Sequence, residues 1–177
     1  MIHLARHGQT AYNSEGRFQG HLPVPLDDAG RDQARALAGV AARHELASLW
    51  CSPLERARET ASVIAARIGL EPQVDARFAE TDCGDWTGRA FAEIRAEDPD
   101  AFARFEATDP DFRFPGGESY AEQTERVMDG LADLRAGREQ LPALVVCHRV
   151  TIRLALIATF GERERARVIP NGDLVTL

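Results

Sequence analysis

The chain has 177 residues, a length that suits one globular domain and is short for two. Hydrophobic residues make up 44% and charged residues 28%, a composition that excludes a disordered chain. The formal net charge of −7 argues against nonspecific binding to nucleic acid or to an anionic membrane, because both reward a basic surface. All 21 basic residues are arginines, so a site for an anionic substrate needs a local cluster of arginines.

Cysteine usage and hydropathy indicate the cellular compartment of the protein. Cys51, Cys83 and Cys147 are odd in number and widely spaced, which is atypical of a disulfide framework or a zinc site. The start of the chain has no long apolar stretch, so no signal peptide is expected, and no run approaches the roughly 20 apolar residues of a membrane span. We therefore predict a cytoplasmic protein with no nucleic-acid or membrane partner. The oligomeric state is left open, with a homodimer among the alternatives.

The first half of the chain alternates predicted strands and helices. Residues 1–5 form a short apolar run that is typical of a buried strand, and residues 8–27 are rich in glycine and proline and are predicted as loop. A helix is expected from Asp27 or Asp28, with Ala34, Leu37, Ala38 and Ala41 on one face. Residues 49–51 are predicted as a second buried strand.

The sequence Ser52-Pro53-Leu54-Glu55 follows that strand and combines a capping box with proline at the first helical position. It predicts a helix that runs to about Ile68, and a short strand is expected near residues 73–75. Ser119 and Glu122 repeat the capping box and open another helix. A third apolar strand is predicted over residues 143–147, a helix over 150–160 and a last strand over 174–177. This alternation predicts an α/β fold, a three-layer α/β/α sandwich with a mostly parallel sheet, as one domain over residues 1–177.

The segment of about residues 89–117 interrupts this alternation. It holds five of the eight phenylalanines, together with many acidic residues: Phe91, Phe102, Phe105, Phe112 and Phe114. The favoured interpretation is a small satellite core under a long excursion of the chain. The alternative is a cap over the site that excludes water and selects the substrate.

Chemically capable side chains follow three of the predicted strands. Arg6, His7 and Gly8 follow the first strand, Arg56 comes soon after the second, and His148 follows the third. Ligands of open α/β sheets bind beyond the carboxyl ends of the strands, so these side chains are expected to converge. Each of them alone is more often structural or surface-exposed, and the prediction depends on their combination.

The combination suits phosphoryl transfer. A neutral imidazole can attack phosphorus through its bare nitrogen and form a phosphohistidine, which water then cleaves. Arginine side chains match the oxygens of the transferring group and offset their charge. The leaving alcohol needs a proton from a nearby carboxylic acid or histidine, which this reasoning leaves unassigned.

At these residues the sequence resembles the histidine phosphatase superfamily, which includes cofactor-dependent phosphoglycerate mutases and many small-molecule phosphatases. The matching blocks occur in order over nearly the whole chain, at residues 4–10, 13, 16–20, 25–26, 51–57, 60–61, 80, 84–88, 115–119 and 145–148. The resemblance implies a phosphoglycerate-mutase-like fold without a metal or other cofactor.

The resemblance also implies roles for individual residues. His7 is the expected nucleophile, with Arg6, Arg56 and His148 around the phosphate. Glu80 is the expected proton donor to the leaving group, and Asp82 is the competing candidate. Asn13, Gln19 and Gly20 are expected on the substrate side.

Two positions depart from the pattern of the family. Gln9 stands where many members have glutamate, and it is expected outside the chemistry. Arg149 stands where many members have glycine, and it could reach a second anionic group of the substrate or point to solvent. Arg17 and Arg153 are further candidates for anion contacts, although a solvated or salt-bridged position is the favoured interpretation for each.

The resemblance implies that mutases of this type are longer chains, whose extra segments shield the phosphohistidine from water. Because this chain is short, net hydrolysis is the expected outcome. The predicted substrate is a small phosphate ester, with an uncharged or aromatic body favoured by the apolar, acidic segment 89–117. A phosphoglycerate-type phosphomutase is the alternative within the family. A catalytically silent phosphate-binding protein and a nucleotide-binding α/β module are the alternatives of other classes, although the module lacks a glycine-rich phosphate loop.

Overall fold

Five strands form one mixed sheet at the centre of the computed structural model, which describes residues 1–177. The strands are β1 (Ile2–Arg6), β2 (Ser48–Cys51), β3 (Pro72–Val74), β4 (Ala143–Cys147) and β5 (Leu174–Thr176). Their order across the sheet is β3-β2-β4-β1-β5. Only β5 runs antiparallel to its neighbour. The carboxyl ends of β1, β2 and β4 therefore meet at one edge of the sheet.

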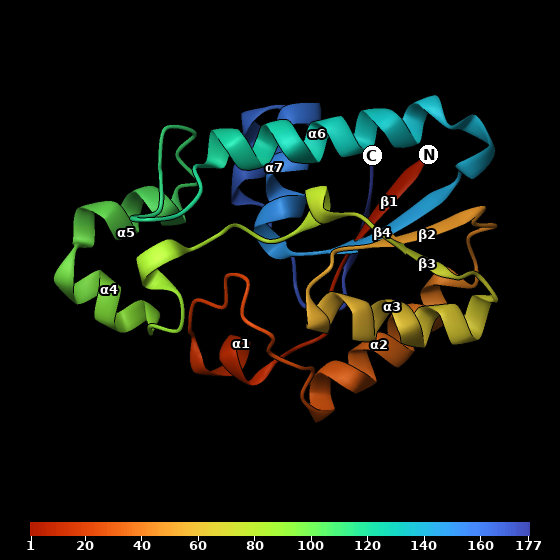
Figure 1. The fold of residues 1–177 in the computed structure, drawn as a ribbon, viewed down its shortest axis with the longest axis horizontal. Coiled ribbons are helices and arrows are strands. Elements are labelled where there is room, and N and C mark those ends of the chain that lie inside the picture. The colour runs from red at the N-terminus through yellow and green to blue at the C-terminus, as the bar shows by residue number, and fades with distance from the viewer.

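Helices cover both faces of the sheet (Figure 1). On one face, α2 (Asp28–Ala41) and α3 (Glu55–Ile68) pack against it through a cluster that includes Leu37, Leu49 and Ile64. On the other face, α6 (Tyr120–Ala136) and α7 (Arg149–Phe160) pack through a second cluster that includes Leu4, Leu131 and Ile152. The predicted three-layer α/β/α sandwich with a mostly parallel sheet is confirmed. No helix is both long and apolar enough to cross a bilayer.

The segment 89–117 contains α4 (Phe91–Glu97) and α5 (Pro99–Glu106), which lie beyond the carboxyl edge of the sheet in Figure 1. Four of its phenylalanines form a third cluster of buried side chains together with Phe18, Trp86 and Tyr120, and the partly buried Phe91 packs against this cluster. Many neighbouring rings in this cluster meet edge-on, as do those of Phe18 and Phe105 with centroids 5.0 Å apart, and others are tilted, as for Phe102 and Phe105. The satellite core that the sequence predicts is therefore present, and it anchors α4 and α5 to the main body.

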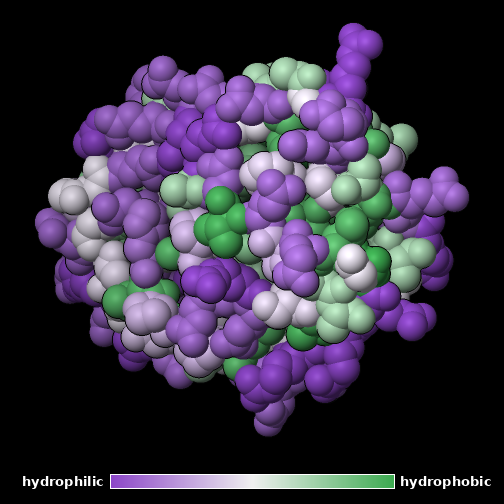
Figure 2. All heavy atoms as spheres, turned by 45° about the vertical axis from the view of Figure 1, so that its right-hand side comes forward, coloured by the Kyte–Doolittle hydropathy of each residue, from purple (hydrophilic) through white to green (hydrophobic).

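The face of the molecule in Figure 2 is mostly polar. Figure 2 shows charged and polar residues spread over one face, with hydrophobic residues in scattered groups between them. Acidic and basic side chains of the segment 89–117 pair with each other on the outside, as in Arg89–Glu97 and Arg104–Asp109. These acidic residues therefore form ion pairs at the surface of the segment.

Two local predictions are wrong. The segment 8–27 is not loop throughout, because Thr10 and Asn13 form a capping box and start α1 (Ala11–Glu15). The capping box at Ser52 does not form, and α3 begins only at Glu55 with Leu54 as its N-cap. Ser52 Oγ instead accepts the Leu54 N–H at 3.2 Å and lies 2.7 Å from His148 Nε2. A contact between two strand ends thus replaces the local cap.

The loop after β1 lies directly against the first turn of α2. A Cβ added to Gly30 would lie 2.0 Å from the Gln9 carbonyl oxygen, and one added to Gly8 would lie 2.2 Å from the Gly30 carbonyl oxygen. Both neighbours are backbone atoms, which cannot move aside as a side chain does. Glycine at both positions is therefore required for the path of the chain immediately after His7.

We expect Gly30→Ala to lower the free energy of unfolding by at least about 2 kcal/mol, because backbone must move to admit the methyl group. Gly39→Ala is the matched control, since Gly39 lies in the same helix and an added Cβ meets nothing within 4 Å. That variant should be neutral or more stable by up to about 1 kcal/mol. Urea unfolding of both variants measures the effect, and equal stabilities would contradict the packing described here.

Candidate active site

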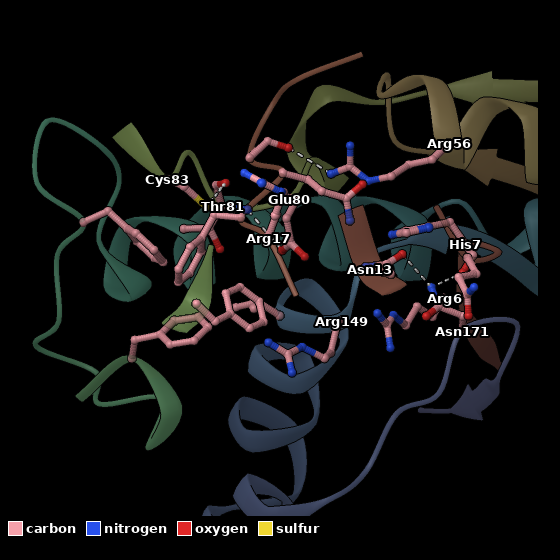
Figure 3. Close-up of a pocket in the computed structure, with 18 residues that line it drawn as sticks. Arg6, His7, Asn13, Arg17, Arg56, Glu80, Thr81, Cys83, Arg149 and Asn171 are labelled. Atoms are coloured by element: carbon pink, nitrogen blue, oxygen red, sulfur yellow. Dashed lines mark hydrogen bonds between the residues drawn. The ribbon is translucent and has the colours of Figure 1, made fainter. Parts of the chain in front are cut away.

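A cavity of about 280 Å³ lies beyond the carboxyl ends of β1, β2 and β4 (Figure 3). Most of the residues predicted for the site line it: Arg6, His7, Asn13, Gln19, Gly20, Arg56, Glu80 and Arg149. His148 is not part of this wall, because its side chain is completely buried behind His7, with ring centroids 5.1 Å apart. The structure therefore brings the predicted residues together, with His148 one layer deeper.

The His7 ring is held in a defined tautomer. Its Nδ1 lies 2.6 Å from the carbonyl oxygen of Gly8, which can only accept a hydrogen bond. The proton of the neutral ring is therefore on Nδ1, and Nε2 carries a free lone pair. The His7 peptide is fixed as well, since its N–H donates to the Cys147 carbonyl and Asn171 Nδ2 donates to its carbonyl at 3.0 Å.

Two arginines bring positive charge to the cavity. Arg6 Nη1 donates to the Ile169 carbonyl at 2.7 Å, and Arg56 Nη2 donates to the Gly20 carbonyl at 2.9 Å. Neither side chain forms an ion pair with a carboxylate. The pKa of each is lowered to about 10, mainly by burial, and for Arg6 the nearby charge of Arg149 contributes to this lowering.

Several buried polar atoms at the site have no hydrogen-bond partner. They are Arg6 Nε, Arg56 Nε and His148 Nδ1, and the protein has only one other such side-chain atom, Arg153 Nε. An unpaired buried polar group costs about 1–3 kcal/mol, and such groups are usually explained by a ligand, an ion or a functional role. Their concentration in and beside one cavity suits a polar, negatively charged ligand.

Glu80 reaches the cavity from the irregular segment between β3 and α4. Its backbone carbonyl accepts hydrogen bonds from His21 Nε2 at 2.8 Å and Arg126 Nη2 at 3.2 Å. Its Oε1 accepts the Thr81 N–H at 3.1 Å and lies 3.5 Å from Gln123 Nε2. Asp82, the competing acid, is exposed, lies outside the cavity wall, and caps the Gly84 N–H with its carboxylate.

Sequence reasoning missed two residues near Glu80 and His7. Gln123 of α6 is completely buried and bonds to the hydroxyl groups of Thr81 and Thr151, so it ties α6 and α7 to the Glu80 segment. Asn171 lies beside His7 because the antiparallel β5 begins at the edge where β1 ends. The turn Pro170-Asn171-Gly172 before the last strand was the available signal.

Three further residues considered in the sequence analysis lie in or near the cavities: Arg17, Gln9 and Arg153. Arg17 pairs with Glu15 at 2.9 Å, as favoured from the sequence, and also lines the cavity. Gln9 lies in the wall, although its amide donates to Asp27 at 3.0 Å. The solvated or salt-bridged surface position favoured for Arg153 is wrong, because Arg153 is half-buried with a buried Nε and forms no ion pair.

Burial, followed by the charge of Arg56, lowers the pKa of both His7 and His148 well below 6.5. Both rings stay neutral in the folded protein at a pH where the unfolded chain binds protons. Stability should therefore fall as the pH drops below about 6.5, by up to about 1.4 kcal/mol per pH unit for each histidine.

We expect His148→Gln to reduce this loss of stability between pH 6.5 and 5 by about 1–2 kcal/mol, since one of the two histidines no longer titrates. Urea unfolding at several pH values, with the wild type alongside, measures the difference in slope. Parallel pH curves for the two proteins would contradict a neutral His148 in the folded state.

Comparison with known proteins assigns the chain to a family. The family model of the histidine phosphatase superfamily, branch 1, matches residues 2–175. A bifunctional protein of Mycobacterium tuberculosis is 37% identical over 98% of the chain, which spans about half (48%) of that relative. Phosphoserine phosphatase 1 of Hydrogenobacter thermophilus is 34% identical over 89% of the chain and 75% of its own length.

A solved structure agrees with these matches. A mycobacterial glucosyl-3-phosphoglycerate phosphatase in complex with VO3 superimposes with a TM-score of 0.88 and 32% identity, covering 98% of this chain and 90% of that one. The fold and the match along the whole sequence lead to the same assignment. The chain belongs to the histidine phosphatase superfamily, branch 1.

Proposed function

We propose that this protein hydrolyses small phosphate monoesters through a phosphohistidine on Nε2 of His7. One observation carries the proposal: the hydrogen bond from His7 Nδ1 to the Gly8 carbonyl leaves Nε2 bare in a cavity that also holds Arg6, Arg56 and Glu80. A neutral, oriented nitrogen beside unpaired cations suits attack on the phosphorus of an anionic ester.

The first half-reaction transfers the phosphoryl group to the protein. The Nε2 lone pair forms a bond to phosphorus while the bond between phosphorus and the ester oxygen breaks. Glu80, as a carboxylic acid, gives its proton to the departing alkoxide, which leaves as an alcohol. The unpaired N–H groups of Arg6 and Arg56 donate hydrogen bonds to the phosphoryl oxygens and offset their growing charge.

The second half-reaction returns the protein to its starting state. The Glu80 carboxylate takes a proton from water as the water oxygen attacks phosphorus, and the bond between phosphorus and Nε2 breaks. Inorganic phosphate leaves, and both His7 and Glu80 regain their original protonation. His148 supports this cycle from behind, because Ser52 lies at its Nε2 and its ring packs against that of His7 with centroids 5.1 Å apart.

The substrate side of the cavity is assigned to Asn13, Gln19, Gly20 and Arg149. The Asn13 amide oxygen accepts from Asn171 at 3.2 Å, and Gln19 Oε1 accepts from the Thr10 hydroxyl at 2.8 Å. Phe91, Phe105 and Phe114 form the apolar part of the same wall. The segment 89–117 thus acts as a cap that contributes to the site as well as a satellite core.

Hydrolysis is favoured over phosphoryl transfer between substrates. The matched relatives include a phosphoserine phosphatase and a glucosyl-3-phosphoglycerate phosphatase, which by name release phosphate from small esters. Independence from metal ions and a cytoplasmic location are further parts of the proposal. The first of them is tested by the presence of a chelator in the assay below.

We expect wild-type protein to release phosphate from 4-nitrophenyl phosphate in excess EDTA and His7→Ala to lose at least about a thousandfold in rate. His44→Ala is the matched control, because His44 follows α2 at the opposite end of the sheet and should leave the rate unchanged. Equal rates for His7→Ala and the wild type would remove His7 as the nucleophile. Phosphate binding without turnover by the wild type would identify a silent phosphate-binding protein.

Glu80→Gln should lower the hydrolysis of an alkyl phosphate by about 100- to 10,000-fold, because an alkoxide leaves poorly without a proton. The loss in kcat/KM, which reports the transfer of the phosphoryl group to His7, should be smaller for 4-nitrophenyl phosphate, whose phenolate leaves without help. Asp82→Asn is the control and should leave both rates close to those of the wild type. A larger loss for Asp82→Asn than for Glu80→Gln would make Asp82 the acid.

A further inference from the structure

A second cavity adjoins the proposed active site on the side of α4 and α5. It has a volume of about 200 Å³, and its wall includes Arg149 and Arg153 of α7 together with Phe102. Phe91, Phe105, Arg149 and Val150 line both this cavity and the active site. A ligand with its phosphate at His7 therefore has room to extend between α7 and the aromatic rings, along the direction that Arg149 takes in Figure 3.

The two arginines present positive charge without a partner. They are four residues apart on α7, so they lie on the same side of the helix. The Arg149 side chain forms neither an ion pair nor a hydrogen bond within the protein, and the Arg153 side chain reaches only Thr108 Oγ1 at 3.4 Å and the Arg167 carbonyl at 3.5 Å. Arg153 Nε is buried and unpartnered. Burial and the nearby charge of Arg149 also lower the pKa of Arg153.

No carboxylate in the cavity wall balances these charges. Glu106 is the one acidic residue there, and its carboxylate is paired with Arg95 at 3.0 Å. The Arg95 guanidinium in turn lies 4.5 Å from the centre of the Phe102 ring. The free charge of the cavity is therefore positive. A solvated surface arginine keeps its N–H groups in water. The Nε of Arg153 is buried, so Arg153 is not an ordinary surface arginine.

We propose that Arg149 and Arg153 form a second anion subsite, so that the substrate is a phosphate monoester with a second anionic group, either a carboxylate or another phosphate. The body between the two anions packs against Phe91 and Phe105. This inference rests on the proposed function. It adds a second charge to the expected substrate with an uncharged or aromatic body, because the apolar wall receives that body while α7 receives the charge.

Three matched aryl esters test the subsite: 4-(carboxymethyl)phenyl phosphate, its carboxamide, and 4-(phosphonomethyl)phenyl phosphate. The methylene group keeps the leaving phenols similar in acidity, so differences in kcat/KM report on the second group. We expect the wild type to favour one or both charged esters over the amide by at least about tenfold. Arg153→Gln and Arg149→Gln should each reduce this preference several-fold, and higher salt should weaken it. Arg135→Gln, at an exposed position on α6, is the control and should keep it.

Binding to the His7→Ala variant, measured by calorimetry, separates the two proposals. In one outcome the wild type hydrolyses none of the esters, but His7→Ala binds a charged ester more tightly than the amide, and adding Arg153→Gln removes this difference in affinity. The subsite then stands and the phosphatase proposal fails. If all three esters are hydrolysed with equal kcat/KM, and Arg153→Gln changes no ratio, the subsite is overturned and the phosphatase proposal stands. A preference for the amide would also overturn the subsite.

Discussion

Buried positive charge without a carboxylate partner is the constraint on which this structure depends. Arg6 and Arg56 lie at the carboxyl edge of the sheet and bond to backbone carbonyls, and part of each guanidinium remains unpartnered. Burying such groups is costly unless something compensates for them. The fold holds them in place through the backbone of residues 20, 22 and 169, so the compensation is left to a bound anion.

The same charges determine the state of the nucleophile. Burial and the two arginines favour neutral His7, and the Gly8 carbonyl fixes the remaining proton on Nδ1. The close contact between Gly8 and Gly30 sets the path of the chain at this point and so the position of that carbonyl. Three separate features, the contact of α2 with the loop, the parallel sheet and the arginine pair, therefore act on one imidazole nitrogen.

The sequence predicts much of this arrangement, because strand patterns and the residues that follow each strand are local signals. Arg6, His7 and Arg56 could be placed at one edge from these patterns alone. Glu80 could not, since it lies in an irregular segment among other acids and depends on Gln123, Arg126 and His21 from other parts of the fold. Asn171 also escaped prediction, because its place beside His7 follows from the antiparallel direction of β5. Ser52 was misread as a helix cap, because its contact with His148 joins residues 96 positions apart.

The most direct test of the central claim is to trap the covalent intermediate. Glu80→Gln protein, in which release of phosphate is slowed, is mixed with 4-nitrophenyl phosphate, quenched within milliseconds at alkaline pH and analysed by peptide mass spectrometry. We expect one phosphoryl group on the peptide that contains His7, and we expect brief acid treatment to remove it because phosphoramidates are acid-labile. Rapid release of nitrophenol and phosphate with an unmodified His7 throughout the time course would contradict it.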